Sequence, residues 1–135
     1  MSINQMIIFL KNIPNINSGG CAIAAISIKR FLKIHKNINC NIIFMNAGEE
    51  EYLINKKSLS GLNNPVSCDH AFIKLKKSYF DCKGKQNKLI QCLVMPEKLV
   101  IDAINNKNEW NSRFNRKYVS AIERKLKIDL SDIIR

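Results

Sequence analysis

The feature that most constrains the fold is the segment that begins at Gly19-Gly20-Cys21 and continues as an apolar run to His35. Isoleucine, leucine and phenylalanine recur within it at helical spacing, with lysine and arginine at other positions. This pattern is typical of an amphipathic helix that buries a broad face. The small side chains of Ala22, Ala24 and Ala25 keep its first turns narrow, so we expect the helix to pack closely against its neighbours.

The flanking regions predict a mixture of helix and antiparallel strand. A capping-box pattern favours a short helix over residues 2–10. Residues 39–45 and 71–75 are β-type runs, and a short polar break leads from the second run into residues 79–81, so a hairpin is predicted. Helices combined with neighbouring antiparallel strands indicate the α+β class.

Other stretches give weaker patterns. Residues 46–65 are polar, include an acidic run and carry turn signals, so we predict a loop with one helical turn at most. Residues 89–95 fit a strand or the start of a helix. Pro96 suits the first position of a helix that reaches Ile104. Residues 109–127 carry apolar side chains at helical spacing and are predicted as one long helix.

Length and composition predict one domain. A chain of 135 residues (1–135) is of single-domain size, and a hydrophobic fraction of 46% is ordinary for a globular core. We expect a core unit over residues 15–84 and a helical C-terminal segment over 95–135. The first residues lack a basic leader, and no run approaches the ~20 apolar residues that span a bilayer. Five cysteines without a pairing pattern indicate reduced thiols, hence a cytoplasmic protein without membrane attachment.

The formal net charge is +11, which favours an acidic partner. The lysines and arginines are spread over at least two predicted helices, so solvated helix faces are the simplest interpretation. Beyond that interpretation, we expect the charge to serve docking to an acidic macromolecule. A protein is favoured over nucleic acid, because the chain has no recognisable motif that would place base contacts.

Cys21 has the sequence context of a nucleophile. A free thiol is mostly protonated at neutral pH, whereas the unpaired N–H groups at a helix N-terminus favour the thiolate. The backbone N–H of Cys21 could also donate to an oxyanion. Without its context, Cys21 would be taken as a small apolar residue in a core helix.

A base and an acid follow downstream. His70 begins a predicted strand, and a tight turn after that strand would bring Asp81 close to His70 on the adjacent strand. A carboxylate there can accept the imidazole N–H, fix the tautomer and stabilise the imidazolium. The other histidine, His35, ends a lysine-rich helix and is expected to be exposed, which makes it a poor catalytic candidate.

Three short motifs carry a family resemblance. Gly19-Gly20-Cys21 at a helix start is followed by Asp69-His70-Ala71-Phe72-Ile73-Lys74 on one strand and by Ser78-Tyr79-Phe80-Asp81 on the next. Their order and spacing resemble the papain-like superfamily of cysteine enzymes, with the closest likeness to its transglutaminase-like and bacterial cysteine-peptidase branches. The likeness covers roughly residues 15–84, about half of the chain.

The resemblance implies a Cys-bearing helix packed on a small antiparallel sheet, followed here by C-terminal helices. It implies Cys21 as nucleophile, His70 as general base and acid, and Asp81 as the residue that orients His70. The expected reaction is hydrolysis or acyl transfer at an amide or thioester bond of a protein or peptide substrate, through a thioester intermediate and without a cofactor or metal. Peptide bonds, isopeptide bonds and glutamine side-chain amides are all open as targets.

Some positions depart from the family pattern. Ala22 stands where many members carry Trp, and no Gln precedes the nucleophile at the spacing that supplies an oxyanion donor. Asn15 and Asn17 are the candidate replacements, and we favour Asn15. Gly19 and Gly20 are expected to let substrate approach the sulfur and to let the backbone turn sharply. The basic C-terminal segment has no counterpart in the family pattern.

Two other constellations compete with this interpretation. A structural zinc could be held by Cys68, His70, Cys82 and Cys92, although the chain has no CxxC knuckle.

An aromatic stripe formed by Trp110, Phe114 and Tyr118 on a basic segment favours core packing over stacking on nucleic-acid bases. The alternative to an enzyme is a non-enzymatic basic protein that binds an acidic protein or nucleic acid.

Overall fold

The computed structural model describes residues 1–17, 19–46, 48–61, 63, 70–76, 78–81, 84–86, 92–106 and 114–134. These residues form five helices and one five-stranded antiparallel sheet, which is the predicted α+β class. The helices are α1 (Ile3–Lys11), α2 (Cys21–Lys36), α3 (Glu49–Ser60), α4 (Glu97–Asn105) and α5 (Tyr118–Leu126). The strands are β1 (Asn41–Met45), β2 (His70–Leu75), β3 (Ser78–Asp81), β4 (Gly84–Gln86) and β5 (Cys92–Val94).

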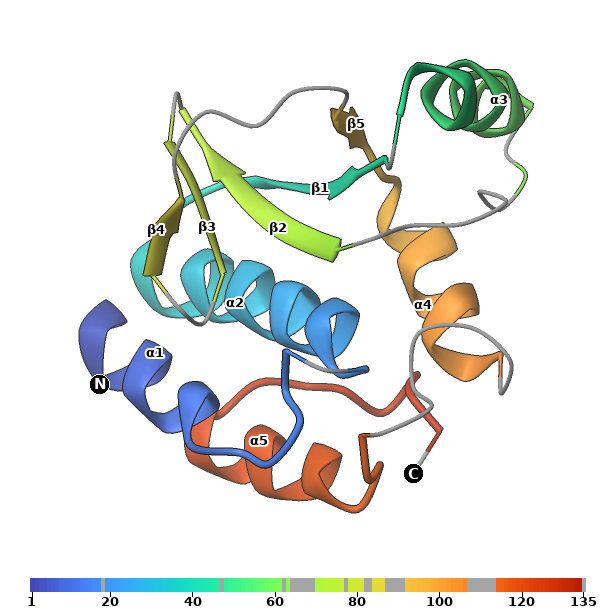
Figure 1. The fold of residues 1–135 in the computed structure, drawn as a ribbon. Coiled ribbons are helices and arrows are strands. Elements are labelled where there is room, and N and C mark those ends of the chain that lie inside the picture. Colours follow the sequence, from blue (N-terminus) through green and yellow to red (C-terminus); the bar gives the residue numbers. More distant parts are fainter. Residues whose placement is uncertain are drawn as a thin grey trace.

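Helix α2 lies at the centre of the fold. The sheet covers one side of it, and α1, α4 and α5 pack on its other sides, while α3 stands apart at the far end of the sheet (Figure 1). Nine of its sixteen residues are buried, including Ala22, Ala24 and Ala25. These small side chains allow close approach of the neighbouring elements, as the sequence predicts. Removal of this apolar surface from water holds the helix in place.

The sheet has the strand order β4-β3-β2-β1-β5. Ile42 of β1 pairs with Ile73 of β2, and both side chains belong to the same apolar core as α2. The neighbouring pair, Ile43 and Phe72, points to the opposite face because side chains alternate along a strand. This second pair is also buried, so the centre of the sheet is covered on both faces.

Several local predictions are confirmed. The capping box closes at α1, where the Gln5 N–H donates to Ser2 Oγ at 3.1 Å and the Ser2 N–H donates to Gln5 Oε1 at 2.8 Å. The hairpin between β2 and β3 turns at Lys76, whose φ is 56°. Residues 92–94 form strand β5 rather than the start of a helix. Pro96 is the N-cap of α4, so the helix begins at Glu97, one residue later than predicted.

The prediction of a loop between residues 46 and 65 is wrong, because α3 occupies most of this stretch. Its acidic run lies in the first turn, where carboxylates interact favourably with the positive end of the helix. The helix has no apolar stripe: its buried residue is Asn55, and Leu53 and Ile54 are exposed. Asn55 Nδ2 donates to Asn46 Oδ1 at 2.7 Å. Hydrophobic periodicity could not reveal a helix anchored by a buried amide pair.

The last helix is shorter than predicted. Helix α5 begins at Tyr118, with Lys117 as its N-cap and a turn at residues 116–117 before it, while 107–113 lie outside the described residues. Asn115 Oδ1 accepts the backbone N–H two residues further on, a local bond that competes with helix formation. The Arg116 guanidinium donates to a carbonyl oxygen of α4. Contacts with the rest of the fold therefore override the helical pattern of this segment.

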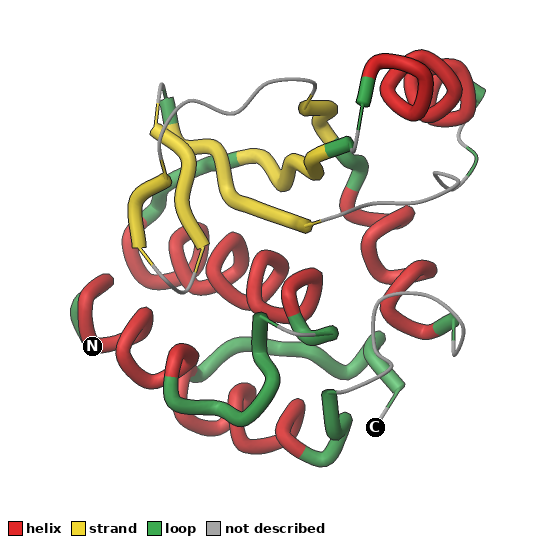
Figure 2. Tube along the Cα trace, viewed as in Figure 1, coloured by secondary structure: helices red, strands yellow, loops and turns green. Residues whose placement is uncertain are grey.

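The segment after α5 returns across the molecule as a loop (Figure 2). Arg30 of α2 fixes its end, since the guanidinium donates to the two carboxylate oxygens of Asp132 at 2.9 and 2.8 Å. The same guanidinium donates to Glu97 Oε1 at 2.9 Å. One cation of α2 thereby joins the C-terminal segment and α4 to the central helix.

Two adjacent glycines set the start of α2. Gly19 has a φ of 106°, in the left-handed region that favours glycine. Gly20 is buried, and a Cβ at this position would lie 2.8 Å from the Ile16 carbonyl oxygen and 2.8 Å from the Phe114 ring. The sharp turn predicted for this glycine pair is present at Gly19. Gly20 in addition allows close packing, and together the two glycines place Cys21.

We predict that Gly20→Ala lowers the free energy of unfolding by about 1–3 kcal/mol, because the added methyl group overlaps backbone and ring atoms. Urea denaturation followed by circular dichroism measures the change. Gly48→Ala is the matched control, since no described atom lies within 4 Å of the Cβ it would add. Equal stability of the two variants would show that Gly20 is not required for packing.

Candidate active site

Cys21 is the first residue of α2 and is half-buried, with a free thiol. Gly20 serves as the N-cap, and the helix start has neither a side-chain cap nor an acidic residue within the described part of its first turn. No side chain in the described part of this first turn therefore neutralises the partial positive charge at the N-terminal end of α2. The sulfur of Cys21 therefore lies at a helix start whose first backbone N–H groups have no side-chain cap.

His70 is the first residue of β2, and its side chain is 18% exposed. Its Nε2–H donates to Asp81 Oδ2 at 2.7 Å, and the Asp81 side chain is only 5% exposed. Charge-assisted hydrogen bonds of this length are among the stronger ones in proteins. The imidazole is thereby held by a buried carboxylate.

The hairpin register explains why these two residues meet. Lys74 of β2 pairs with Tyr79 of β3, so the antiparallel ladder carries Asp81 back toward the start of β2. Continued by one residue, this register puts Asp81 across from Phe72. Because side chains alternate along a strand, Asp81 then shares a face with His70, which lies two residues from Phe72. Phe72, on that face of β2, contacts the His70 ring edge to face, with ring centroids 4.4 Å apart. The sequence analysis did not identify Phe72 as a support for the ring, although its i+2 spacing from His70 is the signal.

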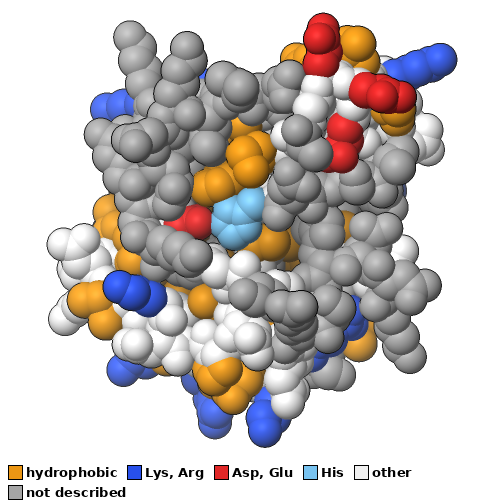
Figure 3. All heavy atoms as spheres, in the orientation of Figure 1, with side chains coloured by type: hydrophobic (Ala, Val, Ile, Leu, Met, Phe, Trp, Pro, Cys, Tyr) orange, Lys and Arg blue, Asp and Glu red, His pale blue; other side chains and the backbone are white. Residues whose placement is uncertain are grey.

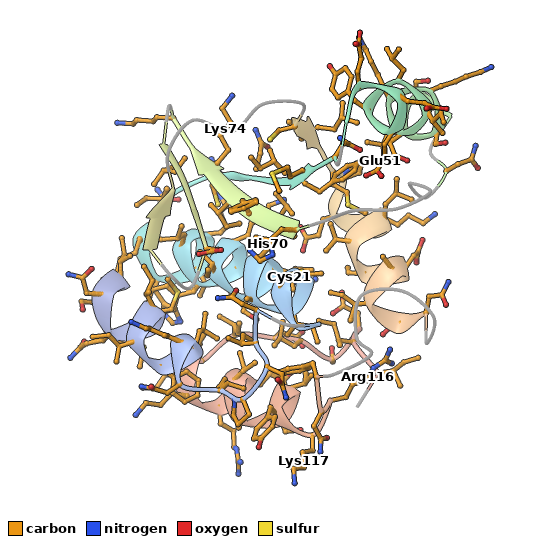
Figure 4. The ribbon with its side chains drawn as sticks, viewed as in Figure 1. Cys21, Glu51, His70, Lys74, Arg116 and Lys117 are labelled. Carbon is orange, nitrogen blue, oxygen red and sulfur yellow. The ribbon has the colours of Figure 1, made fainter. Side chains whose placement is uncertain are left out.

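The Cys21 thiol is the third member of the cluster. His70 interacts with Cys21 both by a side-chain hydrogen bond and by charge. The two labelled side chains lie near each other, Cys21 at the start of α2 and His70 at the start of β2 (Figure 4). In Figure 3 a histidine with a carboxylate beside it is visible from outside the molecule, among hydrophobic side chains. The structure thus brings together Cys21, His70 and Asp81, the three residues that the sequence predicts as a unit.

The environment of His70 favours its charged form. Burial lowers the pKa of the imidazole, but the hydrogen bonds and charge interactions with Asp81 and Cys21 outweigh it and raise the pKa from 6.5 to about 9. At neutral pH the ring therefore carries a proton on both nitrogens. A protonated imidazole beside a thiol is the arrangement that stabilises a thiolate.

The predicted oxyanion residues lie in the loop that leads into α2. Asn15 is exposed and adopts a φ of 61°, and its carbonyl oxygen accepts the Gly20 N–H at 3.3 Å. The Gly20 amide is thus engaged within the loop. Asn17 is half-buried and has a partner of its own. The first-turn amides of α2, beginning with that of Cys21, are the donors nearest the sulfur along the chain.

Two thiols of the zinc alternative, Cys68 and Cys82, lie outside the described residues. Cys92 and His70 both pair with Met45 of β1, so they are separated by two strand spacings, roughly 10 Å. The described part of the chain contains no group of three or more His, Cys, Asp or Glu side chains that could hold a metal ion.

The remaining sequence candidates have structural roles. His35 is exposed, as predicted, and its Nε2–H donates to the carbonyl oxygens of Leu126 and Lys127 at 2.9 and 3.0 Å. It therefore caps the C-terminal end of α5, a role that the sequence did not suggest. Phe114 is buried, in agreement with core packing of the aromatic stripe, while Trp110 lies outside the described residues.

Within the described residues, no helix has the length and apolar character needed to cross a membrane. Comparison with known proteins finds no matching family model, no matching curated protein and no matching solved structure. The functional argument therefore depends on the geometry of the site and on the sequence motifs.

We predict that His70 contributes to stability in a pH-dependent way. Because its folded-state pKa of about 9 exceeds the ordinary 6.5, the contribution is fully present below pH 6.5 and is lost as the pH rises to about 9. Urea denaturation of the wild type and of His70→Gln at pH 6, 7, 8 and 9 tests this. The difference between their unfolding free energies should shrink over that interval, and parallel curves would contradict the prediction.

Proposed function

We propose that this protein is a cysteine-dependent hydrolase or acyltransferase with papain-like architecture, acting on an amide or thioester bond of a protein or peptide. The observation that carries the proposal is the position of His70, which contacts the Cys21 thiol and the Asp81 carboxylate at once. Support for the architecture comes from the central Cys-bearing helix packed on an antiparallel sheet that carries the other two residues. Reduced thiols are kept most readily in the cytoplasm, where we expect the protein to act.

Each residue has a distinct role in the proposed reaction. Since Asp81 occupies Nε2 of His70, Nδ1 is the ring nitrogen left to exchange a proton with Cys21. The Cys21 thiolate attacks the carbonyl carbon, and the S–C bond forms as the carbonyl electrons move to oxygen. His70 then gives its Nδ1 proton to the leaving amine or thiol, whose bond to carbon breaks and leaves a thioester on Cys21.

The second half of the reaction releases the acyl group. Water, or an amine in acyl transfer, attacks the thioester carbonyl while His70 Nδ1 takes the proton from the attacking group. The C–S bond breaks, the acyl product leaves, and the thiolate is regenerated beside the imidazolium. Asp81 keeps the Nε2–H bond throughout and so holds the ring in one orientation. The uncapped start of α2 supplies backbone N–H groups for the negative oxygen of each tetrahedral intermediate.

The proposal predicts selective alkylation of Cys21. Limiting iodoacetamide at pH 6, followed by intact-mass analysis and peptide mapping, should modify Cys21 on the order of 100-fold faster than Cys40 or Cys92, because only a small fraction of an ordinary thiol is ionised at that pH. Burial raises the pKa of both comparison thiols, so they serve as internal controls.

The same measurement on a His70→Ala variant shows whether Cys21 reacts fast because His70 activates the thiolate or only because the thiol is exposed. In this variant the Cys21 rate should fall to that of an ordinary exposed thiol. Uniform slow labelling of all five cysteines in the wild type would favour the alternative, a non-enzymatic basic binding protein.

Substitutions should separate the three roles. Incubation with p-nitrophenyl acetate should give one hydroxylamine-sensitive acetyl group per chain, and peptide, isopeptide and glutamine-containing substrates then define turnover. Cys21→Ala should remove the covalent adduct with little loss of stability, and His70→Ala should lower kcat/KM by roughly 10⁴-fold or more. Asp81→Asn should cost one to two orders of magnitude less than His70→Ala, because it misorients the ring without removing it. Wild-type turnover in His70→Ala would remove His70 from the mechanism.

A further inference from the structure

A second concave surface lies at the opposite end of α2 from Cys21. A cavity of about 540 Å³ is bounded by the C-terminal ends of α2 and α5 and by Met1. Its lining also includes Phe31 and Leu126, which belong to the buried core and, at 1% exposure each, offer almost no accessible surface. Four cationic residues line it: Lys36, Arg124, Lys125 and Lys127. We call this surface the basic cavity.

The four cations of the basic cavity are exposed and have no ion-pair partner among the described residues. Two other cations of α2 differ from them, since Lys29 is paired with Glu97 and Arg30 with Glu97 and Asp132. Like charges gathered without counter-charges repel one another, and an anionic group removes that repulsion. The basic cavity is therefore a place where an anion would be stabilised.

The carbonyl groups at the C-terminal end of α5 are already hydrogen-bonded to another residue. His35 already donates to the Leu126 and Lys127 carbonyl oxygens and covers that helix end. The His35 ring also lies against Phe31, with ring centroids 5.0 Å apart, which holds His35 in place beside the cations. The lysine and arginine head groups are consequently available to an external partner.

The position of the basic cavity limits the kind of partner. Cys21 and His35 belong to one continuous helix, and at ~1.5 Å per residue they lie about 21 Å apart. Figure 1 shows the C-terminal ends of α2 and α5 on the same side of the molecule, away from the labelled Cys21 in Figure 4. A molecule that occupies both the thiol and the cavity must therefore be a macromolecule or a peptide of more than about six extended residues.

We propose that the basic cavity is a docking site for an acidic segment of a protein partner and, given the proposed function, that this partner is the protein substrate. Four exposed cations gathered at one concave surface match a segment rich in acidic side chains. Nucleic acid fits less well, because the cations surround one cavity and the described aromatic side chains at it, Phe31 and His35, are held in internal contacts.

Binding can be tested without any activity. A fluorescein-labelled ten-residue peptide of alternating Glu and Leu is titrated with Cys21→Ala protein in 50 mM salt and followed by fluorescence anisotropy. The matched neutral peptide of Gln and Leu and a ten-nucleotide mixed-sequence single-stranded RNA are the comparison ligands. We expect the acidic peptide to bind most tightly and its affinity to fall steeply by 200 mM salt.

The decisive variant is Lys36→Ala/Lys125→Ala, which should weaken acidic-peptide binding on the order of tenfold. The control variant Lys56→Ala/Lys57→Ala removes the same charge from exposed positions of α3 and should bind as the parent does. If both variants bound the acidic peptide equally weakly, the effect would come from the loss of net charge alone, and the proposal would be overturned. Absent peptide binding, or tighter binding of the RNA, would overturn it as well.

A second measurement connects the basic cavity to turnover. Appending the acidic segment to a peptide that the wild type cleaves or modifies should lower KM without changing kcat, and Lys36→Ala/Lys125→Ala should abolish that gain. An unchanged KM, with peptide binding intact, would contradict the substrate assignment alone. A protein that binds the acidic peptide but shows no activated Cys21 would instead refute the proposed function and leave the docking site in place.

Discussion

Burial of α2 is the constraint on which the rest of the structure depends. The sheet, α1, α4 and α5 all contact this helix, so its apolar face is shared by nearly every layer of the fold. Because α2 is fixed along its length, both of its ends are fixed as well. Its N-terminal end presents Cys21, and its C-terminal end forms one wall of the basic cavity. A single buried helix therefore sets the distance between the two surfaces that carry the functional argument.

The site combines two kinds of rigid support. His70 and Asp81 lie on paired strands, where ladder hydrogen bonds leave little freedom to move apart. Cys21 lies on a helix whose start is packed so closely at Gly20 that a methyl group has no room. The thiol and the imidazole thus come from different layers, each held by its own packing. Such preorganisation is what a covalent mechanism needs, since a displacement of about 1 Å can cost orders of magnitude in rate.

Two sets of cations differ in a way that the net charge of +11 does not reveal. Arg30 is engaged by Glu97 and Asp132, and its role is to hold the C-terminal segment and α4 against α2. The cations of the basic cavity lack such partners among the described residues. The first group accounts for structure, whereas the second group produces a localised positive potential that steers and holds an acidic partner.

Features set by local chemistry were predictable from the sequence: the capping box at Ser2, the extent of α2, and the hairpin that brings Asp81 to His70. Their signals are side-chain period, cap residues and turn length, which act within a few residues. Helix α3 and the start of α5 were not predictable, because an Asn46–Asn55 hydrogen bond and the bond from Arg116 to α4 decide them. The sequence by itself also determined which three residue types form the candidate site. Only the tertiary structure decided that Cys21 meets His70, since that contact depends on how the buried face of α2 docks on β2, and docking is set by shape and packing between segments distant in the chain.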